Sequence, residues 1–208
     1  MGATVEIAGF VLAGGVSSRM GRPKALLEIG GVPLVVRTAR LVESVTGSAV
    51  VVGKAEAYRV LGLSAVDDDW PGAGPLGGIA TALRVSKAPW NLIVACDLPY
   101  LTRAWLEYLA GRARASQADA VVPMNERGPE PLCAAYHTCG EAAIRTALDR
   151  GTRKVTDGLV DLRIEAIRPE EWKAFDSDDF LFKNMNSPED YEEAKAKLEA
   201  SAARPGGS

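Results

Sequence analysis

The sequence predicts an α/β fold in which helices cover both faces of a mostly parallel sheet, a three-layer sandwich within one domain. Short apolar runs alternate with amphipathic stretches along the 208 residues, which is the pattern of parallel strands joined by helical crossovers. Several runs are apolar at successive positions, as expected for strands with both faces buried. We therefore expect one domain over residues 1–200, followed by a disordered tail of small and polar residues over 201–208.

The alternation of runs defines the expected elements. The expected strands are residues 6–12, 49–52, 65–66, 91–95, 120–122 and 164–167, with residues 132–136 as an antiparallel strand. The expected helices are residues 33–45, 55–61, 76–85, 103–116, 141–150 and 188–200. The last helix has a well-defined start, because Ser187 can act as N-cap, Pro188 suits the first helical position and Asp190 suits the first turn.

Composition argues against several broad classes of protein. The net charge is −3, so no overall basic field predicts nucleic-acid binding. The apolar runs are too short to cross a bilayer and no secretion signal opens the chain, so we expect no membrane association. Cys96, Cys133 and Cys139 are odd in number and form no C-x-x-C pair. This pattern argues against a disulfide framework and against a zinc site, and it favours a protein of the reducing cytoplasm.

A glycine-rich loop follows the first expected strand and is the strongest functional signal. The apolar run ends in Gly14 and Gly15, and the loop then carries Arg19, Arg22 and Lys24. Backbone amides in such a turn form a concave anion site, to which cationic side chains add charge. The alternative to an anion site is an ordinary surface turn whose cationic side chains are only solvated, and Arg22 fits this alternative best. The loop matches neither the Walker A pattern nor the dinucleotide fingerprint, yet it predicts a phosphate site.

Asp97 ends another apolar strand and is a candidate metal ligand. A carboxylate at the mouth of a strand suits Mg²⁺, which favours one or two carboxylates together with phosphate oxygens and water. A turn or N-cap aspartate before Pro99 is the alternative. In open parallel sheets, ligands bind beyond the carboxyl ends of strands, so we expect Asp97 and the glycine-rich loop to converge.

Four segments carry a resemblance to a known family. They read LAGGVSSRMGRPK at 12–24, GPLGGI at 74–79, CDLPY at 96–100 and NMNSPED at 184–190. In this order they resemble the nucleotidyltransferases with a GT-A-like, Rossmann-like α/β fold, and within these the molybdenum cofactor guanylyltransferases. The resemblance implies a Mg²⁺-dependent enzyme that transfers GMP from GTP to a molybdopterin-type cofactor and releases pyrophosphate.

The resemblance also implies roles for individual residues. Leu12 and Ala13 would offer backbone groups to the nucleoside, and Asp97 would hold Mg²⁺. The triphosphate would be held by Gly14, Gly15, Arg19 and Lys24, with Arg19, Lys24 and Asp97 acting in catalysis. The acceptor pocket would be lined by Arg153, Lys154, Lys183, Asn184 and Asn186. For the two asparagines, contact with Mg²⁺ or capping of the following helix is the alternative, and capping is most natural for Asn186.

Base selectivity is expected to depend on the acidic run 67–69. Such residues are usually solvated, but one carboxylate can accept from both the N1–H and the N2 amine of guanine, a pair that adenine and cytosine lack. The resemblance assigns this role to Asp68, with Asp67 as the alternative. Many family members have a polar residue after the second strand, where this chain has Gly53. That departure removes one expected nucleotide contact.

Two alternative functions remain open from the sequence. One is a cytidylyltransferase for the same cofactor, or another small-molecule nucleotide transferase of this fold. The other is a nucleotide-binding accessory module without turnover, although the presence of both Lys24 and Asp97 argues against it. His137 is the sole histidine. That scarcity fits attack by an acceptor phosphate, which is already anionic and needs no general base. Molybdoenzymes or cofactor-handling proteins are possible partners.

Overall fold

The computed structural model describes residues 6–14, 23–176 and 178–202. The strands are β1 (Ile7–Leu12), β2 (Glu28–Ile29), β3 (Val32–Pro33), β4 (Ala49–Gly53), β5 (Ala65–Asp67), β6 (Trp90–Ala95), β7 (Ala120–Asn125), β8 (Gly128–Pro129), β9 (Cys133–His137) and β10 (Ile164–Ile167). The α-helices are α1 (Leu34–Thr46), α2 (Ala55–Arg59), α3 (Pro75–Val85), α4 (Arg103–Ala115), α5 (Glu141–Asp149), α6 (Val155–Gly158), α7 (Pro169–Trp172) and α8 (Pro188–Ala202).

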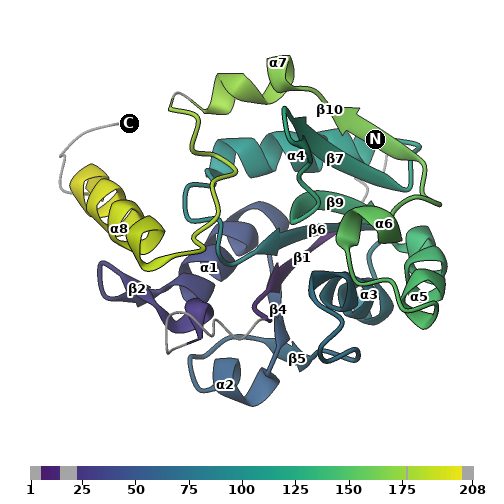
Figure 1. The fold of residues 1–208 in the computed structure, drawn as a ribbon, viewed down its shortest axis with the longest axis horizontal. Coiled ribbons are helices and arrows are strands. Elements are labelled where there is room, and N and C mark those ends of the chain that lie inside the picture. The colour runs from purple at the N-terminus through teal and green to yellow at the C-terminus, as the bar shows by residue number, and fades with distance from the viewer. Residues whose placement is uncertain (1–5, 15–22, 177, 203–208) are drawn as a thin grey trace.

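One sheet forms the centre of the molecule, with strand order β10-β7-β9-β6-β1-β4-β5 (Figure 1). Strands β10, β7, β6, β1, β4 and β5 run in one direction. Strand β9 runs antiparallel to both of its neighbours, β6 and β7. The expected mostly parallel sheet is therefore confirmed, together with its antiparallel strand.

Helices cover both faces of this sheet and complete the three layers. Helices α1 and α4 pack on one face, whereas α3 and α5 pack on the other (Figure 1). Alternate residues of β1 supply the two cores, because Val11 faces the first and Phe10 faces the second. Gly9 allows α1 to approach β1, since a Cβ there would lie 2.4 Å from Val42 Cγ1. These contacts confirm a single-domain α/β sandwich.

The β2–β3 hairpin and its contact with α8 were not predicted. Its turn is formed by Gly30 and Gly31, both with positive φ (59° and 72°), a conformation that favours glycine. Helix α8 closes over the hairpin, because Tyr191 Oη donates to the Glu28 carbonyl at 2.6 Å and Gly30 N donates to Glu199 Oε1 at 3.0 Å. A small core of Ile29, Leu34, Met185 and Ala194 joins them.

Other departures from the expected elements are small. Strand β8 and helices α6 and α7 were not predicted, and α2 ends two residues before the expected limit. Helix α8 continues through Ala202, two residues into the expected tail, and residues from 203 onward lie outside the described part. Among the described residues, no helix is long and apolar enough to span a bilayer.

Candidate active site

The carboxyl ends of β1 and β6 meet at one edge of the sheet, where the sequence predicted a site. The two strands are parallel neighbours with Leu12 opposite Ala95, and Cys96 N donates to the Leu12 carbonyl at 3.1 Å. Just beyond this bond, Lys24 Nζ lies 3.8 Å from Asp97 Oδ2. The expected convergence is therefore present for Lys24, the described end of the cationic loop, and Asp97.

A third residue joins this pair from the far end of the chain. Asn186 Oδ1 accepts a hydrogen bond of 2.9 Å from Lys24 Nζ. The preceding residue is fixed to the same strand end, since Met185 N donates to the Asp97 carbonyl at 3.0 Å. We call Lys24, Asp97 and Asn186 the edge cluster.

Ser187, and not the side chain of Asn186, caps helix α8. Ser187 Oγ accepts from Asp190 N at 3.2 Å, and Asp190 Oδ2 accepts from Ser187 N at 2.9 Å, so the two residues form a reciprocal cap. This confirms the predicted helix start. It also leaves the Asn186 amide free to hold Lys24, so the capping alternative for that side chain is wrong.

Burial dominates the electrostatics of Asp97. Removal from water raises the pKa of its carboxyl group, and Lys24 partly opposes this rise. The two side chains are only 25% and 20% exposed. Within the described residues, Lys24 supplies the one ammonium near this mostly buried carboxylate, 3.8 Å away, which leaves capacity for further positive charge.

The oxygen donors of the edge cluster fit a hard divalent cation. Asp97 offers a carboxylate and Asn186 offers an amide oxygen, both of the kind that Mg²⁺ prefers. In the described part of the chain, no three His, Cys, Asp or Glu side chains gather into a metal cage. Mg²⁺ usually relies on one or two carboxylates and completes its shell with water and phosphate oxygens. A single carboxylate beside a phosphate site therefore suits it.

Gly14 has no structural reason to be glycine within the described residues. Its φ does not lie in the left-handed region, and an added Cβ would meet no described atom within 4 Å. The open backbone at Gly14 leaves room for close approach of a ligand. The other predicted site residues of this loop, Gly15 and Arg19, lie outside the described residues, as does Arg22.

The backbone groups of Leu12 and Ala13 already have partners inside the protein. The Leu12 carbonyl accepts from Cys96 N, and Ala13 N donates to the Val52 carbonyl at 3.0 Å. The Ala13 carbonyl accepts from Tyr58 Oη. Any contact of these carbonyls with a nucleoside would use their second lone pairs. No role was predicted for Tyr58, because the sequence does not distinguish a tyrosine on the buried face of a helix from an ordinary core residue.

Each aspartate of the acidic run has a structural partner. Asp67 Oδ1 accepts from Ala55 N at 3.0 Å at the start of α2. Asp68 Oδ1 accepts from Trp70 N at 3.0 Å and from Thr81 Oγ1 at 3.1 Å. Asp69 pairs with Arg84. Of the three, Asp68 is half-buried while the other two are exposed, and its Oδ2 has no hydrogen-bond partner among the described residues.

The glycines that open α3 serve close packing. A Cβ on Gly77 would lie 3.0 Å from Trp70 Cβ, and one on Gly78 would lie 3.1 Å from Leu12 Cδ2. Gly74 has a φ of 71° immediately before the helix, where Pro75 takes the first position. The structure therefore gives Gly77 and Gly78 a packing role at the start of α3.

The structure divides the five predicted acceptor residues into two groups. Lys183, Asn184 and Asn186 lie on the segment that reaches Asp97, and Lys183 pairs with Glu193. Arg153 and Lys154 precede α6, on the other side of the β1–β6 pair from α8 (Figure 1). The Arg153 side chain donates to the Thr152 carbonyl at 3.0 Å, and Lys154 pairs with Asp157. Within the described residues, neither has a hydrogen bond or ion pair to the edge cluster.

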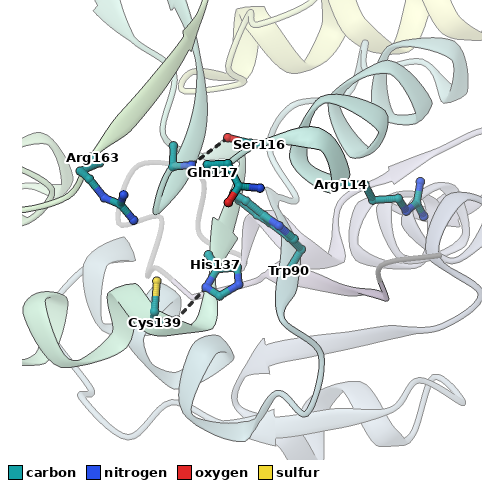
Figure 2. A pocket seen from close by; sticks show the side chains of 8 residues that line it. Trp90, Arg114, Ser116, Gln117, His137, Cys139 and Arg163 are labelled. Carbon is teal, nitrogen blue, oxygen red and sulfur yellow. Dashed lines mark hydrogen bonds between the residues drawn. The ribbon is translucent and has the colours of Figure 1, made fainter. Parts of the chain in front are cut away.

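A hollow of about 300 Å³ lies at the opposite edge of the sheet, at the amino ends of the parallel strands (Figure 2). Trp90, His137, Cys139 and Arg163 contribute to its lining. His137 Nδ1 accepts from Cys139 N at 3.2 Å, and Arg163 pairs with Asp119. None of the predicted site residues lines this hollow, and the lone histidine is therefore remote from the edge cluster.

Comparison with known proteins identifies the family. A family model described as the MobA-like NTP transferase domain matches residues 9–163. The chain belongs to this family. It is thus a nucleotidyltransferase by family, and the match includes Lys24 and Asp97 but ends before Asn186.

Curated relatives of this MobA-like transferase match along nearly the whole chain. A probable molybdenum cofactor guanylyltransferase of Bacillus cereus (strain AH820) is 32% identical over 199 residues, covering 93% of this chain and 98% of the relative. A protein with the same description from Pelotomaculum thermopropionicum is 32% identical over 198 residues, covering 95% and 96%. The alignments with these relatives therefore extend beyond the limits of the family model.

Solved structures show the same fold. Molybdopterin-guanine dinucleotide biosynthesis protein A from Archaeoglobus fulgidus has a TM-score of 0.79 and 26% identity, with 93% of this chain and 99% of that chain covered. The 2-C-methyl-D-erythritol 4-phosphate cytidylyltransferase of Thermus thermophilus has a TM-score of 0.68 and 17% identity, with 94% and 100% covered. The second likeness concerns the fold alone. Together they confirm the expected GT-A-like nucleotidyltransferase fold.

Proposed function

We propose that this MobA-like transferase is a Mg²⁺-dependent guanylyltransferase that transfers GMP from GTP to the terminal phosphate of a molybdopterin-type cofactor. The observation that carries the proposal is the edge cluster beside Gly14, which brings an ammonium, a mostly buried carboxylate and an amide oxygen together. The description of the curated relatives as probable molybdenum cofactor guanylyltransferases supports this choice of substrates.

The reaction is a displacement at the α-phosphorus of the nucleotide. An oxygen of the acceptor phosphate forms a bond to that phosphorus, and the bond to the bridging oxygen between the α- and β-phosphates breaks. Pyrophosphate leaves with the electron pair. The attacking phosphate is already an anion, so positioning and charge stabilisation replace a general base. The remoteness of His137 from the edge cluster agrees with this chemistry.

Lys24 is assigned to the triphosphate and to the charge that develops on the leaving pyrophosphate. Asn186 holds its ammonium group in place through the 2.9 Å hydrogen bond. Arg19 and Gly15 are assigned to the same phosphates from the sequence pattern, and Gly14 leaves its backbone open to them. Fixed donors that face developing charge are usually the largest single contribution to such catalysis.

Asp97 is assigned to Mg²⁺. When bound there, the ion would neutralise phosphate charge and polarise the α-phosphate. Burial disfavours an unpaired negative charge on Asp97, which favours a bound cation, and the Asp97 carbonyl fixes Met185 beside it. Asn184 and Lys183, on the same segment, are assigned to the acceptor phosphate. Arg153 and Lys154 would reach that acceptor from the α6 side.

Asp68 is assigned to guanine recognition. Its Oδ1 is held by Trp70 and Thr81, which fixes the plane of the carboxylate, while Oδ2 has no hydrogen-bond partner among the described residues. A fixed, half-buried acceptor discriminates strongly because a base without the paired donors leaves it unsatisfied. Leu12 and Ala13 are assigned to the nucleoside through their carbonyl groups.

A nucleotide panel tests the proposal. Pyrophosphate release with GTP, CTP, ATP and UTP would be measured with molybdopterin and Mg²⁺, alongside the thermal shift that each nucleotide produces. We expect GTP to give the largest shift and at least tenfold faster turnover. Asp68→Asn should remove that preference, whereas Asp69→Asn, in the same acidic run but paired with Arg84, should retain it.

Two outcomes would favour the alternatives. Preferred turnover of CTP would indicate a cytidylyltransferase, and tight GTP binding without turnover would indicate an accessory module. We place the reaction in the cytoplasm, because Cys96, Cys133 and Cys139 are all free thiols. Molybdoenzymes or cofactor-handling proteins are proposed as partners that deliver or receive the cofactor.

A further inference from the structure

Tyr58 makes the one hydrogen bond that joins helix α2 to the end of β1 among the described residues. Its hydroxyl donates to the Ala13 carbonyl, immediately before the glycine-rich loop. The side chain is 4% exposed, and burial raises its pKa to about 12, so the hydroxyl remains a donor throughout the physiological range. The last described peptide of the loop entrance is therefore fixed from α2.

Helix α2 is itself held firmly against β5. Asp67 Oδ1 accepts from Ala55 N at 3.0 Å at the start of the helix, and Arg59 Nη2 donates to the Ala65 carbonyl at 2.9 Å at its end. These bonds fix both ends of a five-residue helix that is too short to be stable alone. Tyr58 thus acts from a rigid support.

Gly53 leaves the space that the Tyr58 ring occupies. A Cβ at position 53 would lie 3.0 Å from Tyr58 Cε2 and 3.2 Å from the Ala13 carbonyl oxygen. Both distances are tighter than ordinary van der Waals contact, so a side chain there would displace either the ring or the peptide. The departure of this chain from the polar residue expected at position 53 therefore has a physical reason.

The fixed carbonyl also determines where the next amide points. Along the end of β1, the Leu12 carbonyl faces Cys96 on the β6 side, and the Ala13 N–H faces Val52 on the β4 side. The Ala13 carbonyl faces Tyr58, which follows β4. Because a trans peptide is planar, its N–H points opposite to its carbonyl. The Gly14 N–H is thereby directed to the β6 side, where Asp97 and Lys24 lie, and no described residue accepts from it.

We infer that Tyr58 is a positioning residue that turns the Gly14 amide toward the nucleotide phosphates, and that Gly53 is required to admit its ring. This inference rests on the proposed function, since it assigns the phosphates of that reaction to this amide. Tyr58 does not touch the substrate. It acts through the Ala13–Gly14 peptide, which would otherwise be free to rotate.

Removing the Tyr58 hydroxyl alone tests this role. Tyr58→Phe should lower kcat/KM for GTP in pyrophosphate release by about fivefold to tenfold, the loss expected for one hydrogen bond. Tyr136→Phe is the matched control, because Tyr136 is also buried and its hydroxyl donates to a backbone carbonyl, that of Pro131, at 2.7 Å. It should lower the melting temperature to a similar extent while kcat/KM stays within twofold of the original protein.

Adding a methyl group at position 53 gives an independent test. Gly53→Ala should lower kcat/KM for GTP, whereas Gly111→Ala, where no described atom lies within 4 Å of the new methyl, should not. The double variant Gly53→Ala/Tyr58→Phe should lose less than the product of the two single losses, since both changes act on one peptide.

Each result has a definite meaning. If the original protein turns over GTP and Tyr58→Phe has the same kcat/KM as Tyr136→Phe, the positioning role is wrong while the proposed function stands. If both tyrosine variants lose activity in proportion to their melting temperatures, Tyr58 is merely structural and the inference is again overturned. If the original protein neither binds nor turns over GTP, the proposed function and this inference fall together.

Discussion

Two carboxyl groups at opposite edges of the central sheet, Asp119 and Asp97, have pKa values shifted in opposite directions. At the amino edge, Asp119 lies beside Arg163, whose guanidinium holds the pKa of that carboxyl well below its usual range. At the carboxyl edge, burial raises the pKa of Asp97, and it raises the pKa of Glu130 to about 7. The charge of Asp119 is neutralised by Arg163, whereas Asp97 and Glu130 lie in surroundings that disfavour their ionised forms.

This difference in pKa indicates the carboxyl edge as the candidate active site more clearly than the shape of the surface does. The amino edge has a hollow of about 300 Å³, but its arginine pairs with Asp119 and its histidine accepts from Cys139 N (Figure 2). The edge cluster instead keeps the mostly buried carboxylate of Asp97 3.8 Å from the Lys24 ammonium. Groups held in electrostatically costly positions are typical of functional sites.

Replacing Asp97 should produce the largest effect on turnover. Asp97→Asn is expected to reduce pyrophosphate release by about a thousandfold, because the variant lacks the carboxylate assigned to Mg²⁺. Its melting temperature at neutral pH should stay equal or rise. Since the pKa of Asp97 is raised in the folded protein, the ionised carboxylate costs stability at neutral pH, and this cost shrinks as pH falls below the folded-state value and vanishes below the ordinary value of 3.8. A folded variant with normal Mg²⁺-dependent turnover would contradict the assignment.

Replacing Lys24 should reduce turnover less and change stability in the opposite direction. Lys24→Ala is expected to lower turnover by about a hundredfold, as loss of one key charge donor does. It should also lower the melting temperature, because Asp97 loses the cation 3.8 Å away. Arg40→Ala, an exposed position on α1, serves as the control for loss of a single positive charge. Equal stability of the Lys24 and Arg40 variants would remove the electrostatic basis of the comparison.

The smallest expected effects are changes in stability with pH, and they should have opposite signs at the two edges. Glu130→Gln should stabilise the protein above pH 7 by about 1–2 kcal/mol, and the gain should vanish below the ordinary carboxyl value of 4.5. Asp119→Asn should destabilise it at pH 7, and that loss should vanish as pH falls below 3.8 toward the lowered folded-state value. Chemical denaturation across pH measures both.

Turnover provides the internal control for this last pair. Asp119→Asn should keep pyrophosphate release within twofold of the original protein, because the amino edge lies at the far side of the sheet from the edge cluster. A large loss of turnover in this variant, with the protein still folded, would show that the amino edge also contributes to catalysis and would contradict the comparison.

The central fold was predictable because its signals are local and repeated. The apolar runs at β1, β4 and β6 are long enough to identify, and the rule for parallel sheets then brings Lys24 and Asp97 together. The β2–β3 hairpin was missed because two-residue strands have no measurable periodicity. Only the pair Gly30 and Gly31, both with positive φ, signalled its turn.

The side-chain partners of the site were harder to predict, since they depend on contacts between distant residues. Asn186 stands next to a helix start, and only the structure shows that Ser187 supplies the cap while Asn186 holds Lys24, 162 positions away. Gly53 was interpreted as a lost nucleotide contact, whereas its space is filled by Tyr58. Neither relationship has a spacing in the sequence that would reveal it.

The attachment of Met185 and Asn186 to β6 and Lys24 has a consequence for biosynthesis. A protein shortened to residue 163, the limit of the family match, would keep β1 and β6. It would lack the Asn186 amide that bonds Lys24 and the contact of α8 with the β2–β3 hairpin. During translation the edge cluster therefore stays incomplete until Asn186 has left the ribosome, long after Lys24 and Asp97.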